Sequence, residues 1–415
     1  MSWYVVAGPS EIDRKRGMAG ESRSPRPGSR GRRLRPALAA LAVAAGLLVT
    51  ATAQAQFESV TPGDEQLVSA TGDTPAIAMN AQGRGVIAWS DGSIQARTFA
   101  ADGLRPQFAV NTAPGTLLDP RVAIDARGGF VVVWSGREVR GQVYRGEGRR
   151  RGGELTLSPR NVTAAHPEVA MAADGRFVVA WEQSTPDPSR AVRLATFTAG
   201  GGRMGRPLTM PAIGTMANLV GAVSASADSV AVGWTEFTPC PSNPIDPVSA
   251  VMSFRWSLAL LRDVDRLAND NPCVDGPQVL ALQGSDYQGP LGIFVGRRYS
   301  IQRFSSADGE RFGPRTNVAE LPACGATDCA RVVAVAGDQR GRFVFVWERF
   351  TNGHYELSGE FYGREGERRV ESFPISTGSS TAPQHAAAAM TSDGTLVVTW
   401  RRSGTGIVVR RFRVD

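Results

Sequence analysis

Apolar and polar positions recur along this chain in units of roughly 50 residues. A unit begins with Pro or Ala, continues through a short Val-Ala-rich run, turns at Asp or Asn with Gly, and closes an apolar run with Trp. Apolar alternation on both sides of such a turn predicts two paired strands. Five clear copies cover residues 75–89, 120–134, 167–181, 330–347 and 383–400.

Two weaker copies and the segments after each Trp complete the pattern. One weak copy starts at Ala217, and the other starts at Pro277 and lacks the Trp. After the Trp, a polar loop leads to a third strand ending in an aromatic residue, and a Gly-containing turn leads to a short fourth strand. Four strands per unit at this spacing predict the blade of a β-propeller.

We therefore predict an all-β fold, a β-propeller of seven four-stranded blades. The predicted units start near residues 75, 120, 167, 217, 277, 330 and 383. Residues 235–330 are irregular, so six or eight blades are also compatible with the sequence. The last unit ends after its third strand, and the apolar segment 65–70 is expected to supply the missing strand and close the ring.

Stacking explains why the second strands are apolar on both sides, as in the Val-Val-Val run before Trp134. One four-stranded sheet cannot bury both of its faces, whereas neighbouring sheets cover both. The recurring Trp is then expected to anchor adjacent sheets, since its place in the strand repeats in nearly every unit.

The Pro-x-Val-Ala start and the Gly-Phe-Val-Val-Val-Trp strand resemble the seven-bladed propeller repeats of exported bacterial proteins. The likeness covers about residues 66–414. It implies a fold rather than an activity, because propellers serve as enzymes, as lectin-like binders and as scaffolds.

The formal charge of +7 is concentrated at the N-terminus. Residues 1–55 hold nine basic and three acidic residues, so +6 lies there and about +1 in the rest. A basic stretch, the apolar run 37–49 and the Ala53-Gln54-Ala55 site are typical of a secretory signal. Thirteen apolar residues are short of the ~20 that span a bilayer. Residues 1–55 are thus predicted as an N-terminal extension and signal peptide, with Met1 or Met18 as the start, and 56–415 as one domain.

Four cysteines fit the oxidising compartment that a signal peptide implies. Three pairings are open in principle, and the short loop between Cys324 and Cys329 favours that pair together with Cys240 and Cys273. Zinc would need four tightly spaced ligands, and neither a Cys-x-x-Cys pair nor a nearby His is present. No metal site is therefore predicted.

Catalytic signatures with specific spacing are missing from the sequence. There is no Gly-x-Ser-x-Gly, no phosphate-binding Gly-rich loop and no His-Glu-x-x-His. A sialidase-type repeat would place Asp and Trp five apart, whereas Asp174 and Trp181 are seven apart. Calcium would need several oxygen ligands, and each turn carries one acid, so Asp125, Asp174 and Asp393 are expected to cap their own turns. No cofactor is expected.

Loops after the second strands and connections between units are expected to gather on one face of the propeller, around the central channel. This face would hold His166 and His385 and the candidate ligand-binding residues, although loops collect polar residues in any fold. The candidates are Glu182, Glu236, Glu348, Arg349, His354 and Arg401.

These observations predict an exported, secreted or periplasmic binding or scaffold protein that recognises a protein or a glycan through this face and is not an enzyme. The alternative is a hydrolase or lyase acting on glycans, with acids and arginines at the channel. Nucleic acid is not expected as a partner, because the basic excess lies in the signal segment. A monomer without a lasting membrane span is expected.

Overall fold

The computed structural model describes residues 59–415, except 113–114, 116, 186–189, 212–217, 239–245, 268–278, 284–291, 297–299, 305–315, 321–327, 339, 352, 364–365 and 377–383. The predicted signal segment and three of the four cysteines lie outside the described residues. Cys329 lies in a described strand, but its side chain does not belong to the described part.

Strands dominate the described residues and form seven antiparallel sheets, none of which closes on itself. The first three sheets, in chain order, are β2 (Asp73–Met79), β3 (Gly85–Ser90), β4 (Ile94–Ala100), β5 (Gly103–Leu104) and β6 (Phe108–Ala109); β7 (Leu118–Ile124), β8 (Phe130–Ser135), β9 (Val139–Arg145), β10 (Arg149–Arg150) and β11 (Leu155–Thr156); and β12 (Ala164–Met171), β13 (Phe177–Ser184), β14 (Arg190–Phe197) and β15 (Leu208–Thr209).

The remaining four sheets follow the same order. They are β16 (Asn218–Ala225), β17 (Ser229–Thr238), β18 (Asp246–Arg255) and β19 (Leu260–Leu267); β20 (Val279–Gln283), β21 (Gly292–Gly296), β22 (Ser300–Phe304) and β23 (Thr316–Glu320); β24 (Asp328–Gly337), β25 (Phe343–Thr351), β26 (His354–Tyr362) and β27 (Arg368–Pro374); and β28 (Gln384–Met390), β29 (Thr395–Arg402) and β30 (Gly406–Val414) with β1 (Val60–Ser69).

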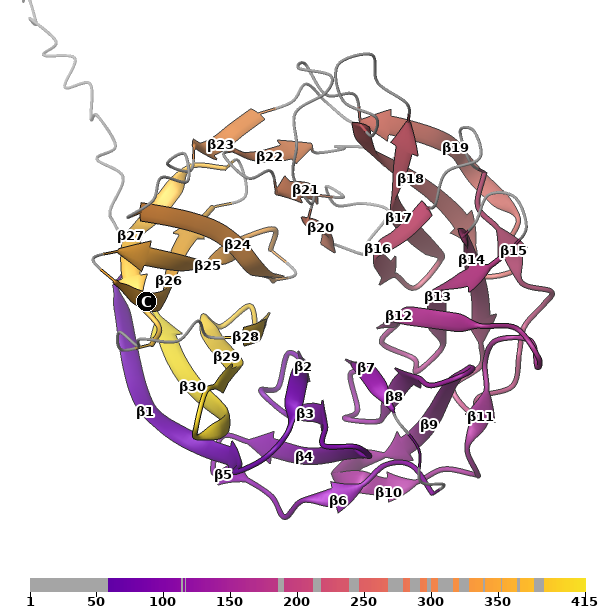
Figure 1. Ribbon diagram of the computed structural model, residues 1–415, viewed down its shortest axis with the longest axis horizontal. Coiled ribbons are helices and arrows are strands. Elements are labelled where there is room, and N and C mark those ends of the chain that lie inside the picture. The colour runs from indigo at the N-terminus through magenta and orange to yellow at the C-terminus, as the bar shows by residue number, and fades with distance from the viewer. Residues whose placement is uncertain are drawn as a thin grey trace, which may run out of the picture. The chain divides into compact units, whose positions relative to one another are not determined.

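The sheets are arranged around a centre, with their first strands innermost (Figure 1). β2 contacts both β7 and β28, and the first strands of the other sheets likewise contact those of their neighbours. This arrangement makes the described chain an all-β propeller, as the sequence predicts. β1 pairs with β30, from Val60 opposite Val414 to Ser69 opposite Ile407.

The expectation of four strands in every unit is wrong for the first and second sheets, which have five. Their outer strand is divided into two short pieces, β5 and β6 in the first sheet and β10 and β11 in the second. Pro106 lies between the first two pieces and has no N–H to donate, while Gly152 and Gly153 lie between the second two.

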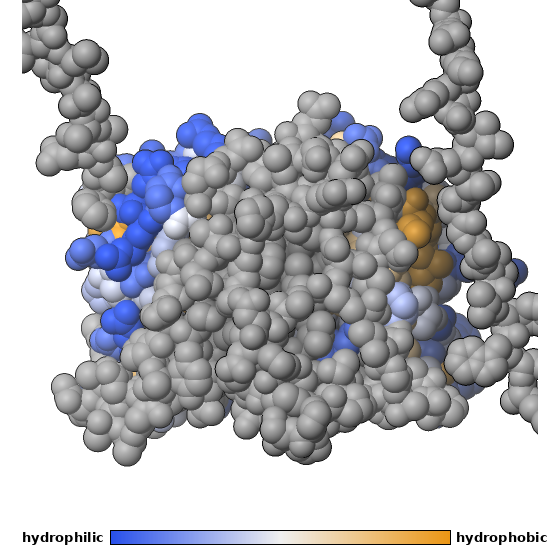
Figure 2. All heavy atoms as spheres, turned by 90° about the horizontal axis from the view of Figure 1, so that it is seen from above, coloured by the Kyte–Doolittle hydropathy of each residue, from blue (hydrophilic) through white to orange (hydrophobic). Residues whose placement is uncertain are grey.

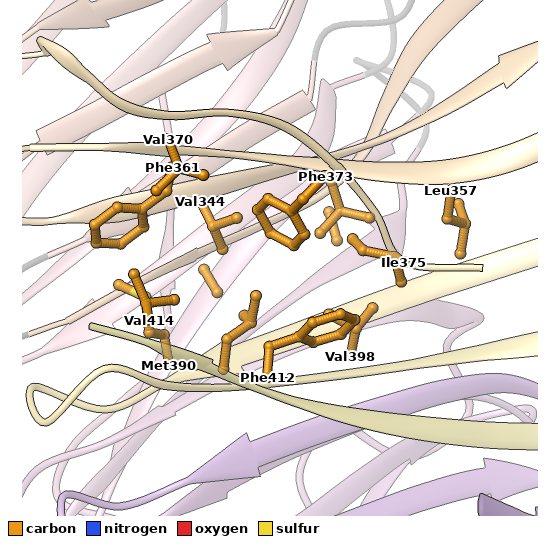
Figure 3. Close-up of a cluster of buried hydrophobic side chains, with 14 of the residues drawn as sticks. Val344, Leu357, Phe361, Val370, Phe373, Ile375, Met390, Val398, Phe412 and Val414 are labelled. Carbon is orange, nitrogen blue, oxygen red and sulfur yellow. The ribbon is translucent and has the colours of Figure 1, made fainter. Parts of the chain in front are cut away.

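The core lies between neighbouring sheets rather than inside one. Along β8, Phe130, Val132 and Trp134 pack with residues of the first sheet, while Val131 and Val133 pack with the third. Other neighbouring sheets are also joined by clusters of buried hydrophobic side chains. Figure 3 shows the cluster between the sixth and seventh sheets. Burial on both faces therefore accounts for the absence of strict alternation in these strands.

In the turns between first and second strands, aspartate side chains accept hydrogen bonds from the backbone of their own turn. Asp125 Oδ1 accepts hydrogen bonds from the N–H groups of Arg127 and Gly129, at 2.8 Å each. Gly128 has φ 88° and Gly175 has φ 90°, in the left-handed region that glycine adopts at little cost. The predicted turn-capping role of Asp125 is confirmed.

The part of the described surface that is visible in Figure 2 is mainly polar. Hydrophilic residues cover most of the coloured area in Figure 2, and hydrophobic residues form smaller patches. Large exposed apolar side chains among the described residues are Leu67, Leu118 and Leu260. No helix in the described ranges is long and apolar enough to cross a bilayer.

Candidate functional site

A β-bulge recurs near the start of four first strands. The register shifts by one residue in β2, β7, β12 and β28, because two residues there stand in place of one. Each bulge holds a polar, non-glycine residue at positive φ, a conformation that costs roughly 1–2 kcal/mol. These are Thr74 (49°), Asp119 (49°), His166 (46°) and His385 (52°), together called the bulge site.

The bulge site belongs to four consecutive sheets, in the order seventh, first, second and third. Registers also shift in β16 and β24, next to Val220 and Val332, but neither valine has positive φ. Strained polar residues persist where the surrounding structure holds them, and they concentrate at binding and catalytic sites. Among the described residues, these four sheets therefore differ from the others in both the chemistry and the backbone conformation of their bulges.

Three residues of the bulge site, Thr74, Asp119 and His385, line a central cavity of about 510 Å³. The first strands of six sheets line it, and most of the lining is Ala, Val, Ile or Gly. The charged and polar side chains that line the cavity come from the seventh, first, second and third sheets. They are Thr74, Asp119, Arg121, Glu168 and His385.

One charged group joins the seventh and first sheets. His385 Nδ1 lies 2.6 Å from Asp73 Oδ1, and Arg401 Nη1 lies 3.6 Å from Asp73 Oδ2. His385 and Asp73 are about half exposed, so a ligand can reach both. The pair holds the His385 ring in a fixed orientation at the edge of the cavity.

A second charged group joins the second and third sheets. His166 Nδ1 lies 3.1 Å from Glu182 Oε2, and its Nε2 lies 3.8 Å from Asp119 Oδ2. Arg190 Nη1 donates to the same Glu182 oxygen at 3.0 Å. Glu182 is 5% exposed, so Arg190, together with His166 when that ring is protonated, compensates a carboxylate that has lost most of its water.

The hydrogen bond to Glu182 raises the pKa of His166 above its ordinary value, and the charges of Glu182 and Asp119 act in the same direction. Burial opposes the shift. The ring can therefore hold a proton at a higher pH than a free histidine does.

Nearby, a further ion pair joins the second and third sheets. Arg121 of β7 places its Nε 2.7 Å from Oε1 of Glu168 in β12.

Stability should depend on pH through His166. Its folded pKa is raised, so its contribution is complete below the unfolded pKa of about 6.5 and is lost as pH rises through the folded pKa. The side chain is 51% exposed, which keeps the effect modest. Urea unfolding of the wild type and His166→Gln between about pH 5 and 9 should give a stability difference that shrinks as pH rises. A constant difference would contradict the assignment.

Two of the candidates predicted from sequence lie at this site. Glu182 contacts His166, and Arg401 contacts Asp73. His166 and His385, which the sequence placed in connections between units, form its two ends.

The other four candidates lie elsewhere. Glu236 is fully buried and accepts a hydrogen bond from Trp234 Nε1 at 3.1 Å. Arg349 lies over the Trp347 ring at 4.9 Å and 3.8 Å from Glu360. Glu348 is 6% exposed, and His354 is exposed at the start of β26.

Sequence reasoning missed several site residues, namely Asp73, Thr74, Asp119, Arg121, Glu168 and Arg190. A signal was present, because a polar residue directly precedes Pro75, Pro120 and Pro167 at the start of three units. Proline marks strand edges and bulges, since it cannot donate to the ladder.

Among the described residues, no three His, Cys, Asp or Glu side chains form a group suited to a metal ion.

Comparison with known proteins identifies the fold and no family. No family model matches the chain, and no curated protein sequence matches it. A solved polysaccharide lyase, PL25 ulvan lyase, is similar with a TM-score of 0.52, 10% identity, and coverage of 84% of this chain and 94% of its own. The Dos1 propeller gives a TM-score of 0.48, 10% identity and coverage of 85% and 95%. At 10% identity, the structural similarity to the lyase shows the fold and nothing about activity.

Proposed function

We propose that this protein is an exported β-propeller that binds a glycan or a protein at the bulge site, with a glycan as the better fit. The observation that carries the proposal is the run of four polar residues at positive φ, three of which line the 510 Å³ cavity. The folded protein already holds these residues in their strained conformation, so the side chains are preorganised. Little conformational entropy is therefore lost when a ligand binds.

The polar side chains at and next to the bulge site favour a hydroxyl-rich ligand. They offer carboxylates, guanidinium groups and imidazoles in adjacent pairs, including Asp73 with His385 and Arg121 with Glu168. Sugar hydroxyls both donate and accept, so they match such alternating groups. The lining between them is small and apolar, which suits the C–H faces of a sugar.

In this proposal the seven sheets are the blades of one ring, and the β1–β30 pairing closes it. The protein acts as a monomer outside the cytoplasm, held together by disulfides at its four cysteines, and needs no cofactor. The basic excess in residues 1–55 serves export, so nucleic acid and a lasting membrane span play no part.

Binding should depend on the paired histidines. We expect His385→Ala and His166→Ala each to weaken glycan affinity about ten- to a hundredfold, the loss of a hydrogen bond to a charged group. A glycan array with the full-length protein would supply the ligand, and titration calorimetry the affinities. His354→Ala is the matched control, since His354 is exposed and lies apart from the site. Equal affinity of all three variants would exclude this site.

The second candidate function is cleavage of a glycan. The pairing of His166 with Glu182 and Asp119 favours it, because such a histidine can take a proton from a sugar carbon or oxygen once it is neutral. The similar polysaccharide lyase shares the fold. A panel of polysaccharides with product detection tests it: turnover that falls at least about a hundredfold in His166→Ala would replace the binding proposal.

A further inference from the structure

A second charged depression lies at the other end of the sheets. Its volume is about 220 Å³, and residues of the second and third sheets line it. Arg127, Arg145 and Arg151 are among them. Arg84 of the first sheet lies beside the depression, because a Cβ at Gly128, between the lining residues Arg127 and Gly129, would lie 3.6 Å from its Cδ. We call these four residues and the depression the arginine pocket.

The chain brings the four arginines together through turns at one end of the sheets. Arg84 and Arg127 lie in the turns that join first to second strands, whereas Arg145 ends β9 and Arg151 follows β10. Arg151 extends toward the third sheet, since a Cβ at Gly200 would lie 3.7 Å from its Nη2. The bulge residue Asp119 and the turn after β7 are at opposite ends of that seven-residue strand, about 20 Å apart.

None of the four guanidinium groups has an ion-pair or hydrogen-bond partner in the described part of the chain. Arginines of corresponding turns differ: Arg176 Nε lies 2.6 Å from Asp174 Oδ2, and Arg342 Nε lies 2.8 Å from Asp338 Oδ2. Asp125 lines the pocket, but its Oδ1 accepts from two backbone N–H groups of its own turn. Asp174 also lines it and is engaged by Arg176.

The four arginines therefore outnumber the carboxylates of Asp125 and Asp174 that line the pocket, so positive charge is in excess there. Like charges held around one depression repel each other, and an anion between them relieves the repulsion. Guanidinium groups match the paired oxygens of a carboxylate or a sulfate ester in bidentate geometry. A water occupies about 30 Å³ in the liquid, so 220 Å³ admits a group larger than a bare oxyanion.

We propose that the arginine pocket binds an acidic sugar unit, a uronate or a sulfate ester within a polysaccharide. The apolar side chains of Val143, Met171 and Ala199 line the same depression and can contact the sugar ring. This site rests on contacts independent of the bulge site and stands whether or not that site binds a ligand.

The test measures binding of the full-length protein to heparin, polygalacturonate and neutral dextran by calorimetry at low and high salt. We expect binding to at least one of the two acidic polymers, none to dextran, and weakening by salt, since exposed charges are screened. The double variant Arg127→Ala/Arg145→Ala should lose at least tenfold in affinity. Arg145→Lys should lose less, because it keeps the charge but not the bidentate fork.

The matched control is Arg160→Ala, which removes an exposed arginine of the loop between β11 and β12. It should retain wild-type affinity for the acidic polymer. Thermal unfolding should show unchanged midpoints for the arginine variants, because their side chains are exposed. Equal binding of the double variant, equal loss in Arg160→Ala, or no binding of either acidic polymer would overturn the proposal. Binding of inorganic sulfate or of phosphatidylserine vesicles, with no acidic polysaccharide bound, would also overturn it.

Discussion

Replacing Trp134 by alanine is expected to lower the free energy of unfolding by about 3–5 kcal/mol. The side chain is fully buried and packs in the cluster between the first and second sheets. Its indole N–H has no hydrogen-bond partner among the described residues, so the loss is one of packing and of a cavity left behind. Urea denaturation followed by circular dichroism would measure it.

Leu67→Ala serves as the comparison for Trp134→Ala. Leu67 is 51% exposed, so the change should stay within about 0.5 kcal/mol. A cost below about 1 kcal/mol for Trp134→Ala would show that the two sheets are not packed on this residue in solution.

Gly406→Ala should destabilise the pairing of the first and last strands by about 3 kcal/mol. Gly406 has φ 109°, and a Cβ there would overlap the carbonyl oxygen of Ser69. The cost adds backbone strain of roughly 1–2 kcal/mol to an overpacking cost of similar size. Thermal unfolding and hydrogen exchange of the β1 amides would report it.

Gly404 in the same hairpin offers a matched control. It has φ 74°, and no atom lies within 4 Å of a Cβ built there. Gly404→Ala should therefore cost only the strain of a left-handed residue, roughly 1–2 kcal/mol, and leave exchange in β1 unchanged. Similar effects of both variants would mean that β1 does not pack against Gly406.

The repeat predicts the fold because its signals are local. A Trp that ends an apolar run, as Trp134 and Trp181 do, fixes the second strand, and Asp125 with Gly128 fixes the turn before it. The outer strands are less regular, since Pro106 divides one of them in a way that a four-strand template does not anticipate.

The site was harder to predict, because its contacts join different sheets. His166 acquires its partners from β13 and from Asp119 of the preceding sheet, and His385 from Asp73 at the other end of the chain. Positive φ at these positions arises from the register of the bulges, which alternation alone does not specify. Glu236 and Glu348, chosen for their place after a Trp, are instead buried.

The pairing of β1 with β30 has a consequence for biosynthesis. β1 is made more than 330 residues before its partner β30, which begins at Gly406. Ser59, directly before β1, and Asp415, directly after β30, exchange two backbone hydrogen bonds. A nascent chain therefore carries an unpaired strand edge until translation is almost complete, and unpaired edges promote association with other chains. A chain that stops before Gly406 leaves that edge exposed permanently, which would mark unfinished molecules for chaperones and proteases.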